Sequence, residues 1–165
     1  MPPETPLPSL RLRPCHPDEM PLLHLLATRE PFFFHTDGRL IDFQEFAKMD
    51  IRWFILVDET DKAYAVASFG FLDTINRSAG VGGIVLPDHR KTGVGKLLHE
   101  AICDFGFNVI GLHKLWASVV EDNRRVWEGL KMHGWVVSGF LKDAQFMDGK
   151  WHNRVLLERI NGTRP

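Results

Sequence analysis

Apolar and polar residues change their spacing several times along the chain, and each change indicates a different element. Residues 10–15 (LRLRPC) alternate apolar and basic side chains, which is the two-residue period of a half-buried strand. Leucines spread over residues 18–29 indicate a helix that follows Pro17. Residues 42–50 are typical of a short second helix, with Asp42 as its N-cap residue.

The pattern changes to short strands after residue 52. Three apolar segments, separated by the turn-rich sequences ETD and TINRS, cover residues 53–58, 62–73 and 79–87. They predict a three-stranded antiparallel meander that the first strand continues or flanks.

The second half of the chain alternates helix and strand signals. Apolar residues from Val94 to Phe105 recur on one helical face, and residues 114–120 (KLWASVV) have the composition of a buried strand. A further helix is expected over residues 123–132. The chain closes with residues 135–143 and 151–160, which predict a hairpin around Asp148 and Gly149. With no repeat or low-complexity linker, these signals predict a single α/β domain.

Composition narrows the function classes. The chain has 165 residues, 44% of them hydrophobic and 25% charged, and a net charge of -1. Such a charge argues against a general nucleic-acid or membrane surface, so an anion site must be a local concentration of positive charge. No apolar run approaches the roughly 20 residues needed to span a bilayer. Cys15 and Cys103 lie far apart and lack metal-ligand spacing. They fit a reducing compartment, so we expect a cytoplasmic protein without a metal.

The ends of the chain differ from its middle. Residues 1–9 are rich in proline and lack the basic start and apolar segment of a signal peptide, so we expect a disordered leader there. We expect the domain to cover residues 10–160 and a short tail to cover residues 161–165.

The segment DHRKTGVGKLLHE (residues 88–100) combines glycines, positive charges and the start of a helix. A strand that enters a glycine turn and then a helix gathers unpaired backbone N–H groups at the positive end of the helix dipole, where phosphate binds. The alternative is a tight connection with solvated basic side chains, and the segment alone does not separate the two. A P-loop is excluded, because Arg90 and Leu97 stand where that motif needs glycine and serine or threonine. The dinucleotide motif fits poorly, because several antiparallel strands precede the turn.

Two motifs in this half of the chain carry a family resemblance. Residues 90–95 (RKTGVG) resemble the (Arg/Gln)-x-x-Gly-x-(Gly/Ala) signature of the GNAT superfamily of acyl-CoA N-acyltransferases, and residues 84–87 resemble the fourth strand of that family. Residues 123–135, from Asn123 through Leu130 to Gly134 and Trp135, resemble its second motif. The segments LRLRP and DGKWHNRVLLERI are similar to the branch of ribosomal-protein alanine acetyltransferases.

The resemblance implies a fold and a donor site. The sheet would be mixed, mostly antiparallel and splayed at its centre, with about seven strands and about four flanking helices. The donor would be acetyl-CoA, whose pantetheine arm would lie like an extra strand in the splay. By resemblance, the CoA pyrophosphate would contact Arg90, Lys91, Thr92, Gly93, Val94, Gly95 and Lys96, and the pantetheine arm would contact Ile84, Val85, Leu86, Asn123 and Leu130. Arg124, Arg125 or Lys131 could meet the adenosine end, and the alternative for each is an ordinary helix-surface charge.

The chain departs from the family at its catalytic positions. Leu130 stands where many members carry a tyrosine that protonates the departing thiolate, and residues 78–87 contain no carboxylate to serve as base. Ser118 and His35 are the candidates for catalytic roles: Ser118 would orient water or protonate the thiolate, and His35 would act as a base. The alternatives are that the backbone satisfies the hydrogen bonds of a buried Ser118 and that His35 is only a polar side chain on an aromatic loop. Glu30 and Asp73 are weaker candidates, and Asp73 fits a turn equally well.

The partners follow from the same resemblance. The predicted reaction is acetyl transfer to a primary amine by direct attack, with a protein N-terminus, a small amine or an amino-acid-like metabolite as acceptor. A homodimer is compatible with the sequence. The alternatives are an acyl-CoA-binding module without turnover and an interaction domain whose glycine turn is empty. Aromatic residues in 31–35, with Phe43, Phe46 and Trp53, form either an acceptor wall or core packing.

Overall fold

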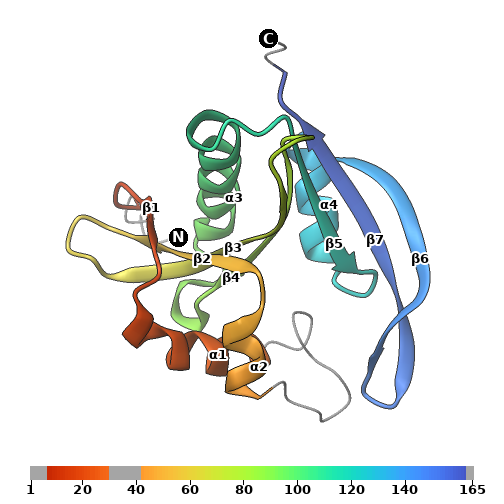
Figure 1. Cartoon of the computed structure of the whole chain (residues 1–165), viewed down its shortest axis with the longest axis horizontal. Helices are drawn as coiled ribbons and strands as arrows, with labels where there is room; N and C mark the ends of the chain where they lie inside the picture. The colour runs from red at the N-terminus through yellow and green to blue at the C-terminus, as the bar shows by residue number, and fades with distance from the viewer. Residues whose placement is uncertain (1–6, 30–41, 163–165) are drawn as a thin grey trace, which may run out of the picture.

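The computed structural model describes residues 7–29 and 42–162 of the chain. Within these ranges seven strands form one sheet in the order β1-β2-β3-β4-β5-β7-β6, and every neighbouring pair is antiparallel except β4 and β5. The same residues form four α-helices that accompany the sheet (Figure 1). The predicted seven-stranded, mostly antiparallel α/β fold is therefore confirmed.

The elements follow the predicted order closely. The strands are β1 (Arg11–Pro14), β2 (Ile51–Val57), β3 (Ala63–Asp73), β4 (Ser78–Val85), β5 (Lys114–Val120), β6 (Val136–Met147) and β7 (Lys150–Ile160). The α-helices are α1 (Met20–Arg29), α2 (Phe43–Lys48), α3 (Val94–Asp104) and α4 (Arg124–Met132). Short turns of 3-10 helix, η1 (Pro17–Glu19) and η2 (Pro87–His89), precede α1 and α3, and a π turn, η3 (Phe105–Val109), extends α3.

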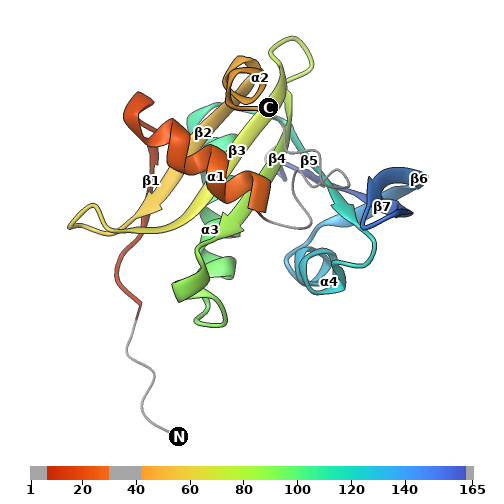
Figure 2. The same ribbon diagram turned by 90° about the horizontal axis from the view of Figure 1, so that it is seen from below.

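Helices cover both faces of the sheet. Helices α3 and α4 lie on one side and α1 on the other, as Figure 2 shows. Each face has its own apolar core, because side chains alternate between the faces of a strand. The larger core packs Leu98 and Ile102 of α3 against Leu56, Ala67 and other strand residues. The smaller one includes Leu23, Ala27, Phe46, Trp53, Val66 and Ile84. Phe46 stacks on Trp53 within this core, at 5.4 Å between ring centroids, so these two aromatic residues pack the core.

The sheet opens between its two central strands. β4 and β5 run parallel and pair only through Ser78 with Lys114, Ala79 with Leu115, and Gly80 with Trp116. Beyond Gly80 and Trp116 the two strands diverge, which Figure 1 shows below the point where they meet. A Cβ atom at Gly80 would lie 2.8 Å from the Trp116 ring, so glycine allows the tryptophan to cover the last paired position. The splay expected from the family resemblance is present.

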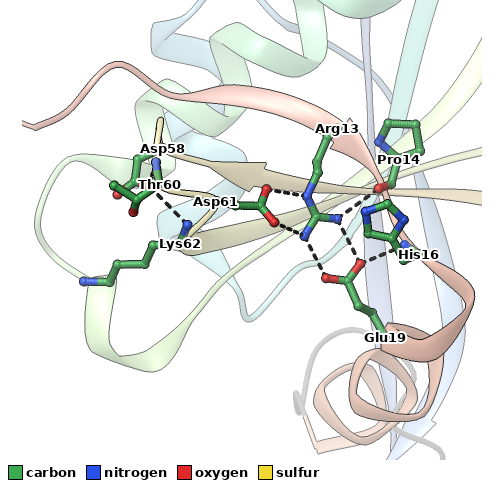
Figure 3. Close-up of polar contacts among 8 residues, drawn as sticks. All are labelled: Arg13, Pro14, His16, Glu19, Asp58, Thr60, Asp61 and Lys62. Carbon is green, nitrogen blue, oxygen red and sulfur yellow. Dashed lines mark hydrogen bonds and ion pairs between the residues drawn. The ribbon is translucent and has the colours of Figure 1, made fainter.

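Arg13 anchors the outer strand β1. Its guanidinium donates to both Glu19 carboxylate oxygens, at 2.7 and 2.9 Å, and to Asp61 in the β2–β3 turn, at 2.7 and 3.2 Å (Figure 3). Glu19 also accepts from the backbone N–H of His16 at 2.7 Å. The Arg13 hydrogen bond lowers the pKa of Glu19 to about 2. One side chain thus fastens a strand, a helix start and a turn together.

Within the ranges 7–29 and 42–162, no helix combines the length and apolar character that a bilayer span requires.

Candidate functional site

The glycine turn links β4 to α3 through a backbone that favours glycine. β4 ends at Val85, η2 follows, and Lys91 and Gly93 then take φ angles of 65° and 91°. Only glycine adopts the second conformation without strain. Gly93 is the N-cap of α3, and its carbonyl accepts from Lys96 N–H at 3.1 Å. The earlier amides of α3 have no acceptor in the helix, so they and the dipole point at the turn.

A pocket of about 570 Å³ opens beside this turn, between α3 and α4. Residues from both sequence motifs line it, although they are separated along the chain. Its lining is Gly83, Ile84, Val85, Arg90, Lys91, Gly93, Gly95, Lys96, His99, Asn123, Arg125, Val126, Gly129, Leu130 and His133.

Most of the expected donor residues meet at this pocket, and three do not. Thr92 turns away, since its hydroxyl donates to the His89 carbonyl at 2.6 Å. Val94 is fully buried in the core under α3. Leu86 is absent from the lining. Asn123 caps the start of α4, and within the described ranges its side chain makes no hydrogen bond, which leaves its amide available to the pocket.

The diverging strands turn backbone N–H and carbonyl groups toward the gap between them. Residues of an antiparallel strand alternate between facing one neighbour and facing the other. Leu86 N–H donates to the Tyr64 carbonyl of β3, so Val85, Gly83 and Val81 point their amides and carbonyls toward β5 instead. Arg90 Nε donates to the Val85 carbonyl at 3.2 Å. The open edge of β4 therefore lies between the glycine turn and the splay, where an extended ligand could pair with it.

The positive charges around the pocket are not equivalent. Arg124 and Lys131 both lie beside Glu128, at 3.7 and 3.4 Å. Arg125 lines the pocket. Three basic residues were considered for a contact with the adenosine end of CoA. Of these, Arg125 is the one that lines the pocket, as such a contact requires.

His99 is a pocket residue that the sequence did not single out. Trp135 donates its indole N–H to His99 Nε2 at 2.5 Å, which leaves the proton of the neutral ring on Nδ1. Burial, and then the charge of Arg159, lowers the pKa of His99 to about 4. Within the described part of the chain Nδ1 has no partner, and the ring stacks on His133 at 5.2 Å between centroids. The sequence does contain one indication that His99 lines the pocket: it lies four residues after Gly95 and therefore on the same side of α3.

Ser118 lies on β5 and is not among the residues that line this pocket. Its hydroxyl accepts from Arg154 Nε at 2.8 Å, so a neighbouring side chain and not the backbone satisfies it. The hydroxyl proton stays available to another acceptor. His35 and Glu30, the other candidates near the acceptor, lie outside the described residues.

Two carboxylates have structural partners: Asp73, a candidate from the sequence, and Asp122, which the sequence did not single out. Asp73 accepts from the backbone N–H groups of Ile75 and Asn76 at 2.9 and 2.8 Å, so it closes the β3–β4 turn. Asp122 lies 2.6 Å from His152 Nδ1, and His152 Nε2 lies 3.1 Å from the Met147 carbonyl. Because both nitrogens of this imidazole are engaged, the pair does not offer a free base.

Within residues 7–29 and 42–162, no three His, Cys, Asp or Glu side chains gather into a potential metal site. Cys15 and Cys103 are both free thiols.

Comparisons with known proteins agree on the type of fold and motif. The family model described as "Acetyltransferase (GNAT) family" matches residues 20–135. A spermidine N(1)-acetyltransferase of Vibrio cholerae is 24% identical over 102 residues, which are 62% of this chain and 59% of that protein. The spermidine N(1)-acetyltransferase of Escherichia coli K12 is 21% identical over 89% of this chain and 83% of its own length.

A solved structure shares the fold. The spermidine N-acetyltransferase of Vibrio cholerae, crystallised with CoA and spermine, superposes with a TM-score of 0.81 at 20% identity, over 92% of this chain and 95% of the other. The first curated relatives are matched over less than two thirds of their length, at 59% and 58%.

Proposed function

Because the chain belongs to the acetyltransferase (GNAT) family, we propose that it is a CoA-dependent N-acetyltransferase that moves an acetyl group from acetyl-CoA to a primary amine. The observation that carries the proposal is that residues of both motifs line one pocket, with the glycine turn at one side and Asn123 at the other. That arrangement suits a ligand with a charged diphosphate and an extended arm.

In this proposal two parts of the donor, the pyrophosphate and the pantetheine arm, make different contacts. The pyrophosphate accepts hydrogen bonds from the first amides of α3, with Lys91 and Lys96 beside it. The pantetheine arm pairs with the open edge of β4, and the Asn123 amide meets it from α4. Main-chain groups provide most of these contacts, and Arg125 faces the adenosine end.

The chemistry is one displacement at the thioester carbon. The neutral amine nitrogen attacks this carbon, the C–S bond breaks, and CoA leaves as thiolate while the new amide nitrogen loses a proton to solvent. A β4 amide facing the splay stabilises the oxyanion. The thiolate takes a proton from water, either directly or relayed through the Ser118 hydroxyl, which regains its proton from the same water, since Leu130 has none to give. Placing the two reactants side by side supplies much of the rate, because amines attack thioesters readily.

The acceptor is a primary amine, and the proposal includes several classes of amine. The relatives named above are spermidine acetyltransferases, and a polyamine is therefore one candidate. A protein N-terminus, to which the likeness to ribosomal-protein alanine acetyltransferases points, a small amine and an amino-acid-like metabolite are others. A homodimer is part of the proposal, and sedimentation velocity tests it.

Release of free CoA thiol from acetyl-CoA across a panel of amines tests the activity. We expect release above the amine-free background for at least one acceptor, with the acetylated amine appearing in equal amount by mass spectrometry. Binding of acetyl-CoA without thiol release would instead identify a binding module, which the absence of a tyrosine at Leu130 would then explain. An absence of binding at millimolar CoA would refute the donor site itself.

A further inference from the structure

Arg154 of β7 is a cation placed among neutral partners. Its guanidinium donates from Nε to Ser118 Oγ at 2.8 Å, from one terminal nitrogen to Gln145 Oε1 at 2.7 Å, and from the other to the Ser118 carbonyl at 2.5 Å. These three bonds use three of the five guanidinium N–H groups. Among the described residues the other two have no acceptor.

The guanidinium lies at the open edge of β5. Glu121 N–H donates to the Asn153 carbonyl of β7, so by alternation the even-numbered residues of β5 point their backbone groups away from β7. The Ser118 carbonyl therefore faces the splay. Since Arg154 donates to this carbonyl from a neighbouring strand, its side chain crosses β5 and ends beside the gap.

Arg154 also lies on the face opposite the donor pocket. Ala117 and Leu115 of β5 pack in the core under α3, whereas Ser118 points to the other face. Arg154 stands opposite Val120 in the register and shares that face. An acceptor that approaches the thioester from the side away from α3 and α4 would meet the guanidinium.

Among residues 7–29 and 42–162, no carboxylate pairs with the positive charge of Arg154. Burial alone lowers the pKa of its guanidinium, with no contribution from a carboxylate. The acids on the same face have other partners: Glu158 pairs with Lys114 at 2.5 Å, and Asp122 pairs with His152 at 2.6 Å. A partly buried cation without a counter-charge is costly unless a ligand supplies one.

We propose that Arg154 binds a carboxylate on the acceptor, so that the enzyme acetylates amino acids or similar amino-carboxylates in preference to polyamines. The inference rests on the proposed function, whose acceptor it specifies. A guanidinium with two free N–H groups suits a carboxylate, whose two oxygens match its geometry. A polyamine would bring ammonium groups toward this cation and be repelled. The same cation favours the neutral, attacking form of the acceptor amine.

Matched pairs of amines test the proposal, each pair an amino acid and its decarboxylated amine: lysine with cadaverine and phenylalanine with phenethylamine, with spermidine added as a polycation. We expect kcat/KM to favour the carboxylate member of each pair and spermidine to be poor. In Arg154→Gln the preference should fall by roughly 10- to 100-fold, the range for a charge-assisted hydrogen bond, at constant KM for acetyl-CoA. A wild-type preference for cadaverine or spermidine, or an equal loss for both members, would overturn the proposal.

Two further variants separate charge from structure. Gln145→Glu keeps Arg154 and its hydrogen bond and adds a carboxylate beside the guanidinium, so the preference should fall although the cross-strand contacts remain. Arg159→Gln removes an arginine from the other face of the same strand, where it contacts Cys103 at 3.4 Å. This control should leave the ratio within each pair unchanged. An unchanged preference in Gln145→Glu together with a changed ratio in Arg159→Gln would mean that Arg154 only stabilises the packing of the strands.

A direct binding measurement keeps the test independent of turnover. Each amine is titrated calorimetrically into protein saturated with CoA, in which no acetyl group is available. Lysine should bind more tightly than cadaverine, and this difference should disappear in Arg154→Gln. Such a result supports the carboxylate site even if no thiol is released and the proposed activity is therefore wrong. Equal binding, or none by any carboxylate, counts against it.

Discussion

Gly95 is the second residue of α3 and lines the pocket beside the glycine turn. A Cβ atom there would find its nearest neighbour, Val85 Cγ2, at 3.8 Å, so a methyl group fits. We predict that Gly95→Glu raises the Kd for CoA by roughly 100-fold or more, because the carboxylate would repel the pyrophosphate at short range. Gly95→Ala is the matched control and should bind CoA almost normally. Isothermal titration measures both, and unchanged affinity in the glutamate variant would remove the pyrophosphate from this turn.

The neighbouring glycine would give a less clear answer. Gly93 has a φ of 91°, where any side chain strains the backbone, so a substitution there mixes folding with binding. The spacing of the two glycines identified the turn from sequence, but it did not distinguish their backbone roles. That difference depends on which residue begins the helix.

The contacts of His99 and Arg154 could not be predicted from the spacing of residues within a motif. The contact between Trp135 and His99 joins residues 36 apart in sequence, and so does the contact between Arg154 and Ser118. Motif spacing reports short-range order, whereas these pairs exist only after the sheet has formed. The glycine turn was therefore predictable as a continuous segment, while the surroundings of His99 and Arg154 were not.

At the scale of elements, the Arg13 contacts hold strand β1 to η1 and to the β2–β3 turn. The side chains of Arg13 and Glu19 are only 12% and 27% exposed, so their ion pair is better protected than a surface pair. We predict that Glu19→Gln lowers the free energy of unfolding at pH 7 by about 1–2 kcal/mol. Urea denaturation measures this, with Glu59→Gln, an exposed change in the same turn as Asp61, as the control.

The same pair predicts a pH dependence. The folded pKa of Glu19 is lowered from 4.5 to about 2, so its contribution is complete above pH 4.5 and declines as the pH falls toward 2. The difference between the wild type and Glu19→Gln should therefore shrink between pH 5 and pH 3. A constant difference over that range would show that the carboxylate charge does not hold β1.

Most elements were predictable because their patterns are regular. β5 runs over Lys114–Val120 as expected, and Asp42 caps α2 by accepting from Glu45 N–H at 2.9 Å. β6 was the least accurate, since it extends to Met147, beyond the predicted end at residue 143. Its register shifts twice, and much of it is exposed on both faces, so no two-residue period marks its full length.

At the scale of the whole molecule, the sheet consists of two parts joined by three residue pairs between β4 and β5. A donor lying in the splay contacts both parts, so binding should stabilise the entire fold. At 100 times Kd, CoA should add about 2.7 kcal/mol, which corresponds to a rise in Tm of roughly 5–10 °C.

Differential scanning fluorimetry checks this prediction. Gly95→Glu, whose affinity for CoA should be at least 100-fold lower, is the control and should show a rise of at most about 1–2 °C at the same CoA concentration. An equal rise in both proteins would place the stabilising site elsewhere.

The splay itself did not follow from periodicity. β4 and β5 read as ordinary buried strands, and only the family resemblance predicted that they diverge. Local patterns determine strand content but not the pairing between strands distant in sequence, which depends on turns and on packing such as Trp116 over Gly80. The candidates in residues 30–41 lie outside the described part of the chain and remain predictions.

The open edge of β4 has a consequence for how such proteins diverge. Main-chain amides and carbonyls are the same whichever side chains a strand carries, so a donor held by them survives extensive substitution. The acceptor contacts proposed for Arg154 depend on a single side chain of β7, and one codon change could redirect them. Substrate choice can therefore drift along a lineage while the donor stays constant, and relatives at about 20% identity that share this fold need not share an acceptor.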